Sequence, residues 1–134
     1  MAGPVVIPIG LSAPTADFNQ GGASQVRYIP GAVDGLTAHA GGGQALATPI
    51  PANVQIARVI TVASAADSVV LPASVGGLEI TVVNATAATS MNVFPATGEA
   101  INALGANTAF AVPGAKTCTF YCATAGQWHT QLSA

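Results

Sequence analysis

The clearest pattern in the sequence is an alternation of apolar and polar residues with a period of two. In the segment 78–84, Leu78, Ile80 and Val82 lie on one side of an extended chain and the residues between them on the other. Similar short segments, many rich in β-branched residues, follow at spacings of roughly ten residues from about residue 52 onward. Pro and Gly stand between them, as turn residues do. This spacing predicts an all-β domain, which we expect to be an antiparallel β-sandwich or barrel with little or no helix.

The last two predicted strands carry much of the expected core. Cys118, Phe120 and Cys122 share one side of the segment 116–123, and Trp128 lies on the strand that follows. In a strand the two cysteines are about 13 Å apart between Cα atoms. A disulfide needs roughly 4.4–6.8 Å, so we expect two buried, free thiols, which suits a reducing cytoplasm. The residues expected in the core are Ile80, Val82, Phe94, Cys118, Phe120, Cys122 and Trp128.

The first part of the chain has no continuous apolar face. Its apolar residues form short patches separated by Gly and Pro, and the run Gly41-Gly42-Gly43 lies near its end. This pattern predicts an extended N-terminal arm over residues 1–48 and an antiparallel β-domain over residues 49–134. Such patches gain stability only by docking on the chain's own domain or on a partner. The residues expected to dock are Val5, Val6, Ile7, Ile9, Val26, Tyr28 and Ile29. We find no exact internal repeat.

The charge content excludes several classes of partner. Charged residues make up 6% of the chain, with three basic and five acidic side chains, against about 25% in ordinary proteins. Three basic residues cannot build a phosphate-binding surface, so we expect no nucleic-acid binding. A polybasic membrane anchor is excluded for the same reason, and Gly and Pro interrupt the long uncharged stretch, so we expect no membrane partner.

The sequence shows little sign of catalytic chemistry. The carboxylates stand singly, and the two histidines lie far apart without a metal-binding spacing, so we expect no enzyme activity, no cofactor and no metal. Four functional interpretations stay open beside a plainer structural one. They are a carboxylate pair of Glu79 and Glu99, a thiol and base made by Cys122 and His129, a ligand-stacking role for Trp128, and the glycosylation sequon at Asn84-Ala85-Thr86. The plainer interpretations are that the two carboxylates are solvated, that Cys122 is a core thiol and that Trp128 is an apolar anchor.

Part of the sequence resembles a known family. Over residues 76–132 it looks like a small β-domain of tailed-bacteriophage virion proteins. The matching segments are Gly77-Leu78-Glu79-Ile80-Thr81-Val82-Val83-Asn84, Asn92-Val93-Phe94-Pro95-Ala96-Thr97-Gly98-Glu99-Ala100-Ile101-Asn102, Phe120-Tyr121 and Gly126-Gln127-Trp128-His129-Thr130. These residues are strand, turn and core residues, and the resemblance brings no catalytic role with it.

The resemblance implies a structural protein of the virion. The first interpretation is a capsid decoration, or cement, protein on the head surface, assembled in the bacterial cytoplasm, with the major capsid protein as its partner. Decoration proteins commonly sit at three-fold positions, so the resemblance also implies a homotrimer. The alternative is a tail fibre, spike or baseplate accessory protein that binds a host surface glycan. A small enzyme is a third, weaker interpretation.

Overall fold

The chain is almost entirely β-structure. The structure is a computed structural model that describes residues 29–41 and 43–134. Within these ranges the strands are β1 (Ala32–Thr37), β2 (Thr48–Pro49), β3 (Ile56–Thr61), β4 (Ser68–Val70), β5 (Glu79–Asn84), β6 (Met91–Phe94), β7 (Ala100–Ile101), β8 (Phe110–Val112), β9 (Thr117–Thr124) and β10 (Gln127–Leu132). The helix α1 (Gly43–Leu46) is a single turn. The prediction of an all-β protein with little helix is therefore confirmed.

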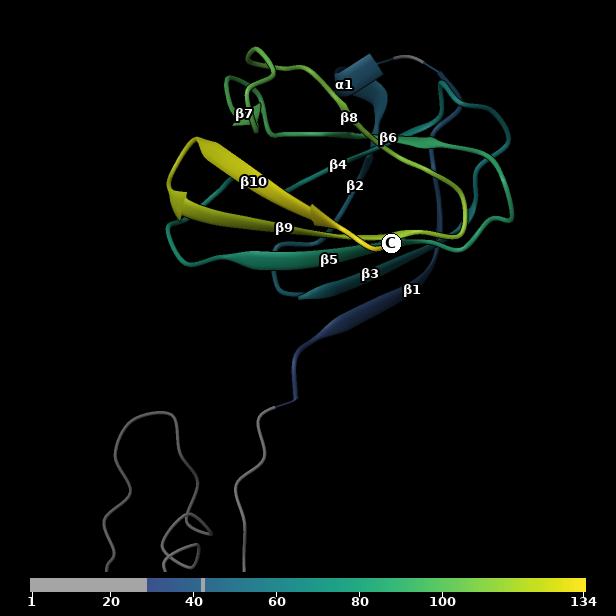
Figure 1. Ribbon diagram of the computed structural model, residues 1–134, viewed down its shortest axis with the longest axis horizontal. Helices are drawn as coiled ribbons and strands as arrows, with labels where there is room; N and C mark the ends of the chain where they lie inside the picture. The colour runs from purple at the N-terminus through teal and green to yellow at the C-terminus, as the bar shows by residue number, and fades with distance from the viewer. Residues whose placement is uncertain (1–28, 42) are drawn as a thin grey trace, which may run out of the picture.

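The strands form two sheets that share one core. The larger sheet has the order β1-β3-β5-β9-β10-β7, and the smaller has the order β2-β4-β6-β8. Figure 1 shows β1, β3, β5 and β9 of the larger sheet in the lower part of the fold and the smaller sheet above them. Buried residues from both sheets meet in a single cluster, with Trp128 and Phe120 as its largest members. Phe110 of the smaller sheet meets Phe120 of the larger one edge to face, with ring centroids 5.9 Å apart.

The first six strands wind like a solenoid. The chain alternates between the sheets, so that β1, β3 and β5 belong to the larger sheet and β2, β4 and β6 to the smaller one. We call one turn of this winding, with one strand in each sheet, a coil. The strands of neighbouring coils pair in parallel: β1 with β3, β3 with β5, β2 with β4, and β4 with β6. Each coil therefore lies beside the next one in both sheets.

The last strands close this stack with a different pattern. β9 pairs antiparallel with β5 and with β10, and β8 pairs antiparallel with β6. The short strand β7 adds to the far edge of β10 in parallel. The C-terminal end of the coil stack is thus covered by strands that run against it.

Two expectations differ from this architecture. The antiparallel sandwich or barrel is wrong for the first six strands, because strands close in sequence lie in different sheets and pair with the next coil. The result is solenoid-like with mixed sheets. Residues 32–48, expected in the arm, lie in the fold, because Val33 and Leu36 of β1 pack against the core and β2 pairs with β4. A boundary after Thr48 would cut β2 in two.

The strands of the smaller sheet end in a common way. An apolar residue followed by proline stands at each end, namely Ile50-Pro51 after β2, Leu71-Pro72 after β4, Phe94-Pro95 at the end of β6 and Val112-Pro113 at the end of β8. Proline has no N–H and a fixed φ, so it stops the ladder and turns the chain toward the larger sheet. This is an inexact repeat that becomes visible once the strand ends are known.

Candidate functional site

One side of the larger sheet faces solvent and is called the outer face. It consists of the side chains of β3, β5, β9 and β10 that point away from the core. The strand register aligns Ile56 with Thr81 and Thr81 with Thr119, so these side chains form a row across three strands. The alternate residues of the same strands, such as Val82 and Phe120, are buried. The predicted alternation therefore divides the sheet into a core side and an outer face.

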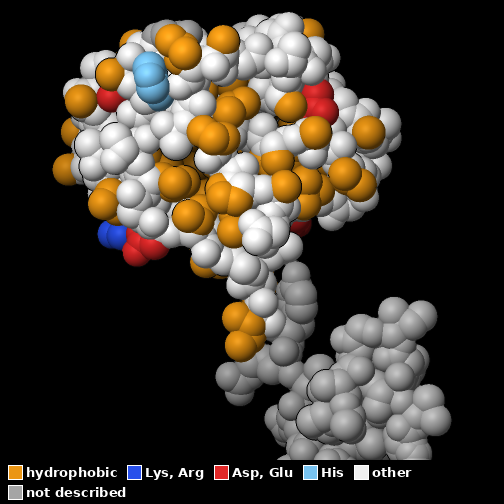
Figure 2. Space-filling model, turned by 180° about the vertical axis from the view of Figure 1, so that it is seen from behind, with side chains coloured by type: hydrophobic (Ala, Val, Ile, Leu, Met, Phe, Trp, Pro, Cys, Tyr) orange, Lys and Arg blue, Asp and Glu red, His pale blue; other side chains and the backbone are white. Residues whose placement is uncertain are grey.

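The outer face carries few charged groups, namely Arg58, which pairs with Asp34, and Glu79 at one end. Its centre carries hydroxyl groups, with the Thr81 and Thr119 side chains 3.1 Å apart in a hydrogen bond. Ile56 and Ile60 of β3 are exposed beside them. Arg58 donates to Asp34 at 2.9 Å, and this hydrogen bond lowers the pKa of the Asp34 carboxyl. On the side shown in Figure 2, hydrophobic and uncharged atoms are interspersed and charged groups occur in few places.

One end of the outer face is polar and hollowed. Glu79 of β5 is aligned with Tyr121 on the adjacent strand β9, and Tyr121 is aligned with His129 on the next strand, β10. The Tyr121 and His129 rings are tilted toward each other with centroids 5.8 Å apart. Glu79 also lines a pocket of about 490 Å³, together with Pro30, Gln55, Ile56, Gly77, Leu78 and Thr81. This end combines a carboxylate with an exposed aromatic ring.

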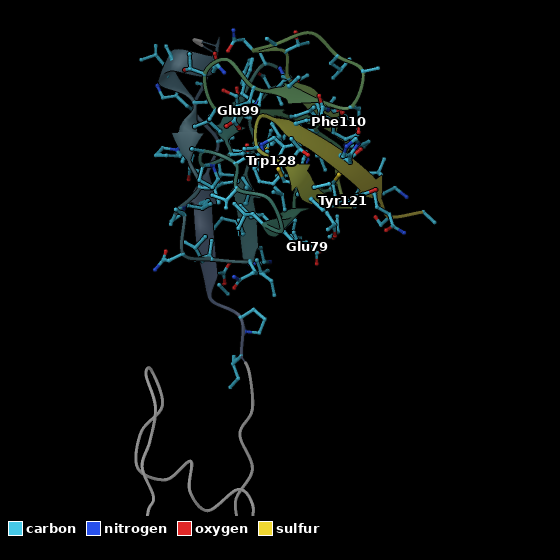
Figure 3. The ribbon with its side chains drawn as sticks, turned by 90° about the vertical axis from the view of Figure 1, so that its left-hand side faces the viewer. Glu79, Glu99, Phe110, Tyr121 and Trp128 are labelled. Carbon is cyan, nitrogen blue, oxygen red and sulfur yellow. The ribbon has the colours of Figure 1, made fainter. Side chains whose placement is uncertain are left out.

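The Glu99 carboxylate serves the interior of the fold. It accepts hydrogen bonds from the Trp128 indole N–H at 3.1 Å and from the Ser74 hydroxyl at 2.9 Å. The Ser74 hydroxyl in turn accepts from the Gly126 N–H at 2.6 Å. Figure 3 shows Glu99 beside Trp128, with Tyr121 and Glu79 lower down along the larger sheet. Trp128 is fully buried with its N–H satisfied, so its role is that of a core anchor.

Asp67 also has a structural role. It is buried at the turn between β3 and β4, where its carboxylate accepts from the Ser64 hydroxyl at 2.8 Å and the Ala63 N–H at 2.7 Å. The Ser64 hydrogen bond, helped by the backbone donors, lowers the pKa of Asp67 although burial opposes this. The carboxylate therefore stays ionised and fixes the turn.

The candidate catalytic pairs are not assembled. Glu99 bonds to Ser74 and Trp128, whereas Glu79 lines the pocket on the outer face. Cys122 is aligned with Trp128 on the core side, while His129 is exposed on the outer face. Within residues 29–41 and 43–134, no three His, Cys, Asp or Glu side chains come together as a metal site would require.

The two cysteines are free and buried. Burial raises the pKa of the Cys118 thiol to about 11, so it stays protonated at neutral pH. The Cys122 thiol lies 2.9 Å from the Thr124 carbonyl oxygen, to which it donates. Neither group has the exposed, electropositive surroundings of a reactive thiolate.

The sequon asparagine is a structural residue. Asn84 is buried, and its amide donates to the carbonyl oxygens of Thr89 at 2.8 Å and Val112 at 3.0 Å. Its side-chain oxygen accepts from the Thr86 hydroxyl at 2.7 Å. Since both amide hydrogens are used inside the fold, the folded chain does not present Asn84 for glycosylation. Sequence reasoning missed this network and that of Ser74, since only the folded chain brings their partners together.

The remaining expected residues fall into four groups. Ile80, Val82, Cys118, Phe120, Cys122 and Trp128 are buried. Phe94 is half-buried, because Met91 and Val93 take the core side of β6 and leave Phe94 on the other. Ile29 is exposed. The other residues expected to dock lie outside the described residues, namely Val5, Val6, Ile7, Ile9, Val26 and Tyr28.

Among the described residues, no helix has the length and apolarity needed to cross a bilayer. Known family models, curated proteins and solved structures yield no match to this chain.

Proposed function

We propose that this protein is a bacteriophage virion structural protein of the capsid decoration type. It binds the major capsid protein on the head surface as a homotrimer and stabilises the shell by the surface it buries. It is made and assembled in the cytoplasm of the bacterial host. No catalytic step belongs to this role, and no cofactor is needed for it.

The observation that carries the proposal is the sparsely charged outer face of the larger sheet, on which Arg58 is paired with Asp34 and Glu79 lies at one end. A face of threonine and aliphatic side chains can be covered by a protein surface at little desolvation cost, because few charges lose their water. A specific contact needs roughly 1,000 Å² or more of buried area, which a sheet face and an additional arm together can supply. The resemblance of residues 76–132 to virion β-domains supports the same assignment.

A second candidate is a tail fibre, spike or baseplate accessory protein that binds a host surface glycan. The observation that favours it is the polar end of the outer face, where Glu79 lines the pocket and Tyr121 lies beside Glu79 on the next strand. An exposed aromatic ring beside hydrogen-bonding groups is a common way to hold a sugar, with the ring against the apolar side of the pyranose.

Copy number separates the two candidates. Quantitative mass spectrometry of purified virions of the encoding phage, calibrated against the major capsid protein, is the measurement. A decoration protein should be present in hundreds of copies per particle. A dozen copies or fewer would contradict the decoration role and favour the tail.

A matched pair of variants tests the face itself. Ile60 is 44% exposed on the outer face, and Leu104 is 38% exposed in the loop after β7. Ile60→Lys should reduce shell occupancy at least about tenfold, because binding would bury an unpaired charge. Leu104→Lys makes the same change outside the face and should leave occupancy unchanged. Equal occupancy of the two variants, with equal thermal stability, would show that the face is not the contact.

A further inference from the structure

An apolar residue followed by proline ends the strands of the smaller sheet. The same pair occurs once more in the chain, ahead of the first of these strands. Pro51 and Pro72 each follow an apolar residue directly after a smaller-sheet strand, and they stand 21 residues apart, the offset at which β2 and β4 are aligned. Ile29-Pro30 stands one such interval before Ile50-Pro51. By this repeat, the residues up to Ile29 correspond to a strand of the smaller sheet that would precede β2.

The exposure of Ile29 sets this copy apart. Its counterparts Ile50 and Leu71 are each 2% exposed, since they sit at the ends of paired strands. Ile29 is 72% exposed. An apolar residue at the same position of the repeat is therefore not buried by residues 29–41 and 43–134.

The covalent connection explains why the chain cannot bury it on its own fold. Gly31 is already fixed beside β3, because its carbonyl oxygen accepts from the N–H groups of Gln55 at 2.8 Å and Ile56 at 3.2 Å. From Ile29 to Gly31 the chain spans at most about 7 Å between Cα atoms, whereas facing sheets lie about 10 Å apart. The shortest crossing seen in the fold, from β8 to β9, uses residues 113–116.

The fold also has an uncovered end where such a strand fits. β1 and β2 are the outermost strands of their sheets at the same end of the coil stack. Val33 and Leu36 of β1 pack against the core but stay partly exposed there. The opposite end is covered by the antiparallel strands β8 and β9.

We infer that residues 26–29 form a strand that docks in parallel beside β2 of a second copy of this chain. The repeat places Arg27 level with Thr48, and Ile29 level with Ile50, in the receiving copy. Each copy then donates a strand to a neighbour and receives one, which closes in a ring or a reciprocal pair. The inference gives a specific contact to the self-association in the proposed function, but it concerns copies in solution and does not need the virion.

The free edge of β2 in the receiving copy limits what can bind there. Pro49 has no N–H, so the free edge of β2 offers carbonyl acceptors without a donor at that residue. Two such edges cannot pair with each other, whereas a strand that brings N–H groups can. On β1, the Gly35 N–H is taken by the Asp34 carboxylate at 2.7 Å. These features disfavour open-ended stacking of the domains.

A pair of engineered cysteines in the full chain tests the inference. Aligned residues of adjacent strands lie about 4.8 Å apart, within the Cα range of a disulfide. Arg27→Cys with Thr48→Cys should form disulfides between chains under dilute, mildly oxidising conditions, seen as covalent dimers or larger species on a non-reducing gel. Arg27→Cys with Leu104→Cys is the control and should stay monomeric on the gel. A disulfide within one chain, no disulfide, or equal cross-linking of the control would overturn the inference.

Ile29 gives an independent readout by mass. In analytical ultracentrifugation, the wild-type chain and Leu104→Asp should sediment as the same oligomer. Ile29→Asp should fall to the monomer mass of 13.1 kDa, because an aspartate cannot enter the apolar end position. A wild-type monomer at all concentrations, or an unchanged oligomer in Ile29→Asp, would refute the docking. A wild-type oligomer that does not bind capsid shells would count against the proposed function alone.

Discussion

The turn at Pro113-Gly114 leaves no room for a side chain. A Cβ atom on Gly114 would lie 2.5 Å from the carbonyl carbon of Ala88 and 2.6 Å from its Cα. These are backbone atoms, which cannot rotate away as a flexible side chain would. The small size of residue 114 is therefore needed for the loop after β5 and the turn after β8 to meet.

Gly114→Ala should destabilise the protein by about 1–3 kcal/mol or more, as overpacking does. Gly105→Ala is the matched control, because a Cβ there meets only the Thr108 hydroxyl at 3.7 Å, an ordinary contact. Its effect should stay within about 0.5 kcal/mol. Urea denaturation of both variants checks this, and a Gly114→Ala midpoint equal to that of the control would contradict it.

Asp67 should make stability depend on acid pH. Its folded-state pKa lies below the ordinary value because of the Ser64 and backbone hydrogen bonds. The stabilisation is therefore present above about pH 4 and lost as the pH falls through the folded pKa. Asp67→Asn should be less stable at pH 7 and should show a shallower loss toward pH 2 in thermal denaturation.

Asp34 provides the comparison for this measurement. Its pKa is also lowered, but by an exposed hydrogen bond from Arg58 that salt screens. Asp34→Asn should change the acid slope less, and the difference should shrink in high salt. Identical acid profiles for Asp67→Asn and the wild type would contradict the role given to Asp67.

At the level of elements, one carboxylate connects three loops. Glu99 lies between β6 and β7, Ser74 between β4 and β5, and Gly126 in the turn between β9 and β10. Glu99→Gln would replace an acceptor oxygen by an NH₂ group that faces donors. It should cost about 1–3 kcal/mol. Glu79→Gln, on the outer face, should change stability by no more than about 0.5 kcal/mol. Guanidinium unfolding curves of the two variants should therefore separate clearly, and coincident curves would refute the bridging role.

The paired strands β9 and β5 should also protect the thiols. Cys118 and Cys122 are buried on the core side, and burial raises the pKa of Cys118 to about 11. In a titration with a thiol reagent at neutral pH, both should react slowly in the native protein and quickly after denaturation. Two fast-reacting thiols on the native protein would contradict the register of β9.

Strand positions were more predictable than strand partners. The alternation in residues 78–84 and 116–123 correctly separated the core side of β5 and β9 from the outer face. A period of two, however, says which side a residue faces and nothing about which strand lies beside it. Nothing in the local sequence distinguishes a turn between hairpin strands from a corner between coils, so the parallel winding was missed. Val33 and Leu36 were too few apolar residues to mark β1 as part of a sheet.

Little of the site was predictable from the sequence. Scattered carboxylates and core cysteines could be recognised from spacing and neighbours, as with Cys122 beside Phe120. The bonds of Glu99 to Ser74 and Trp128 join residues far apart in sequence, so they needed the fold. The same holds for the alignment of Glu79, Tyr121 and His129.

For the whole molecule, the stacking of coils implies that stability varies along the stack. Each coil contacts chiefly its neighbours, so opening can start at an uncovered end without disrupting the rest. β1 and β2 have a neighbouring coil on one side, whereas β5 lies between β3 and β9. Amide hydrogen exchange should therefore be fastest in β1 and β2 and slowest in β5 and β9. Oligomer formation should slow amide exchange in β2 more than in β9. The exchange rate of β2, which depends on local unfolding of its coil, would then measure assembly.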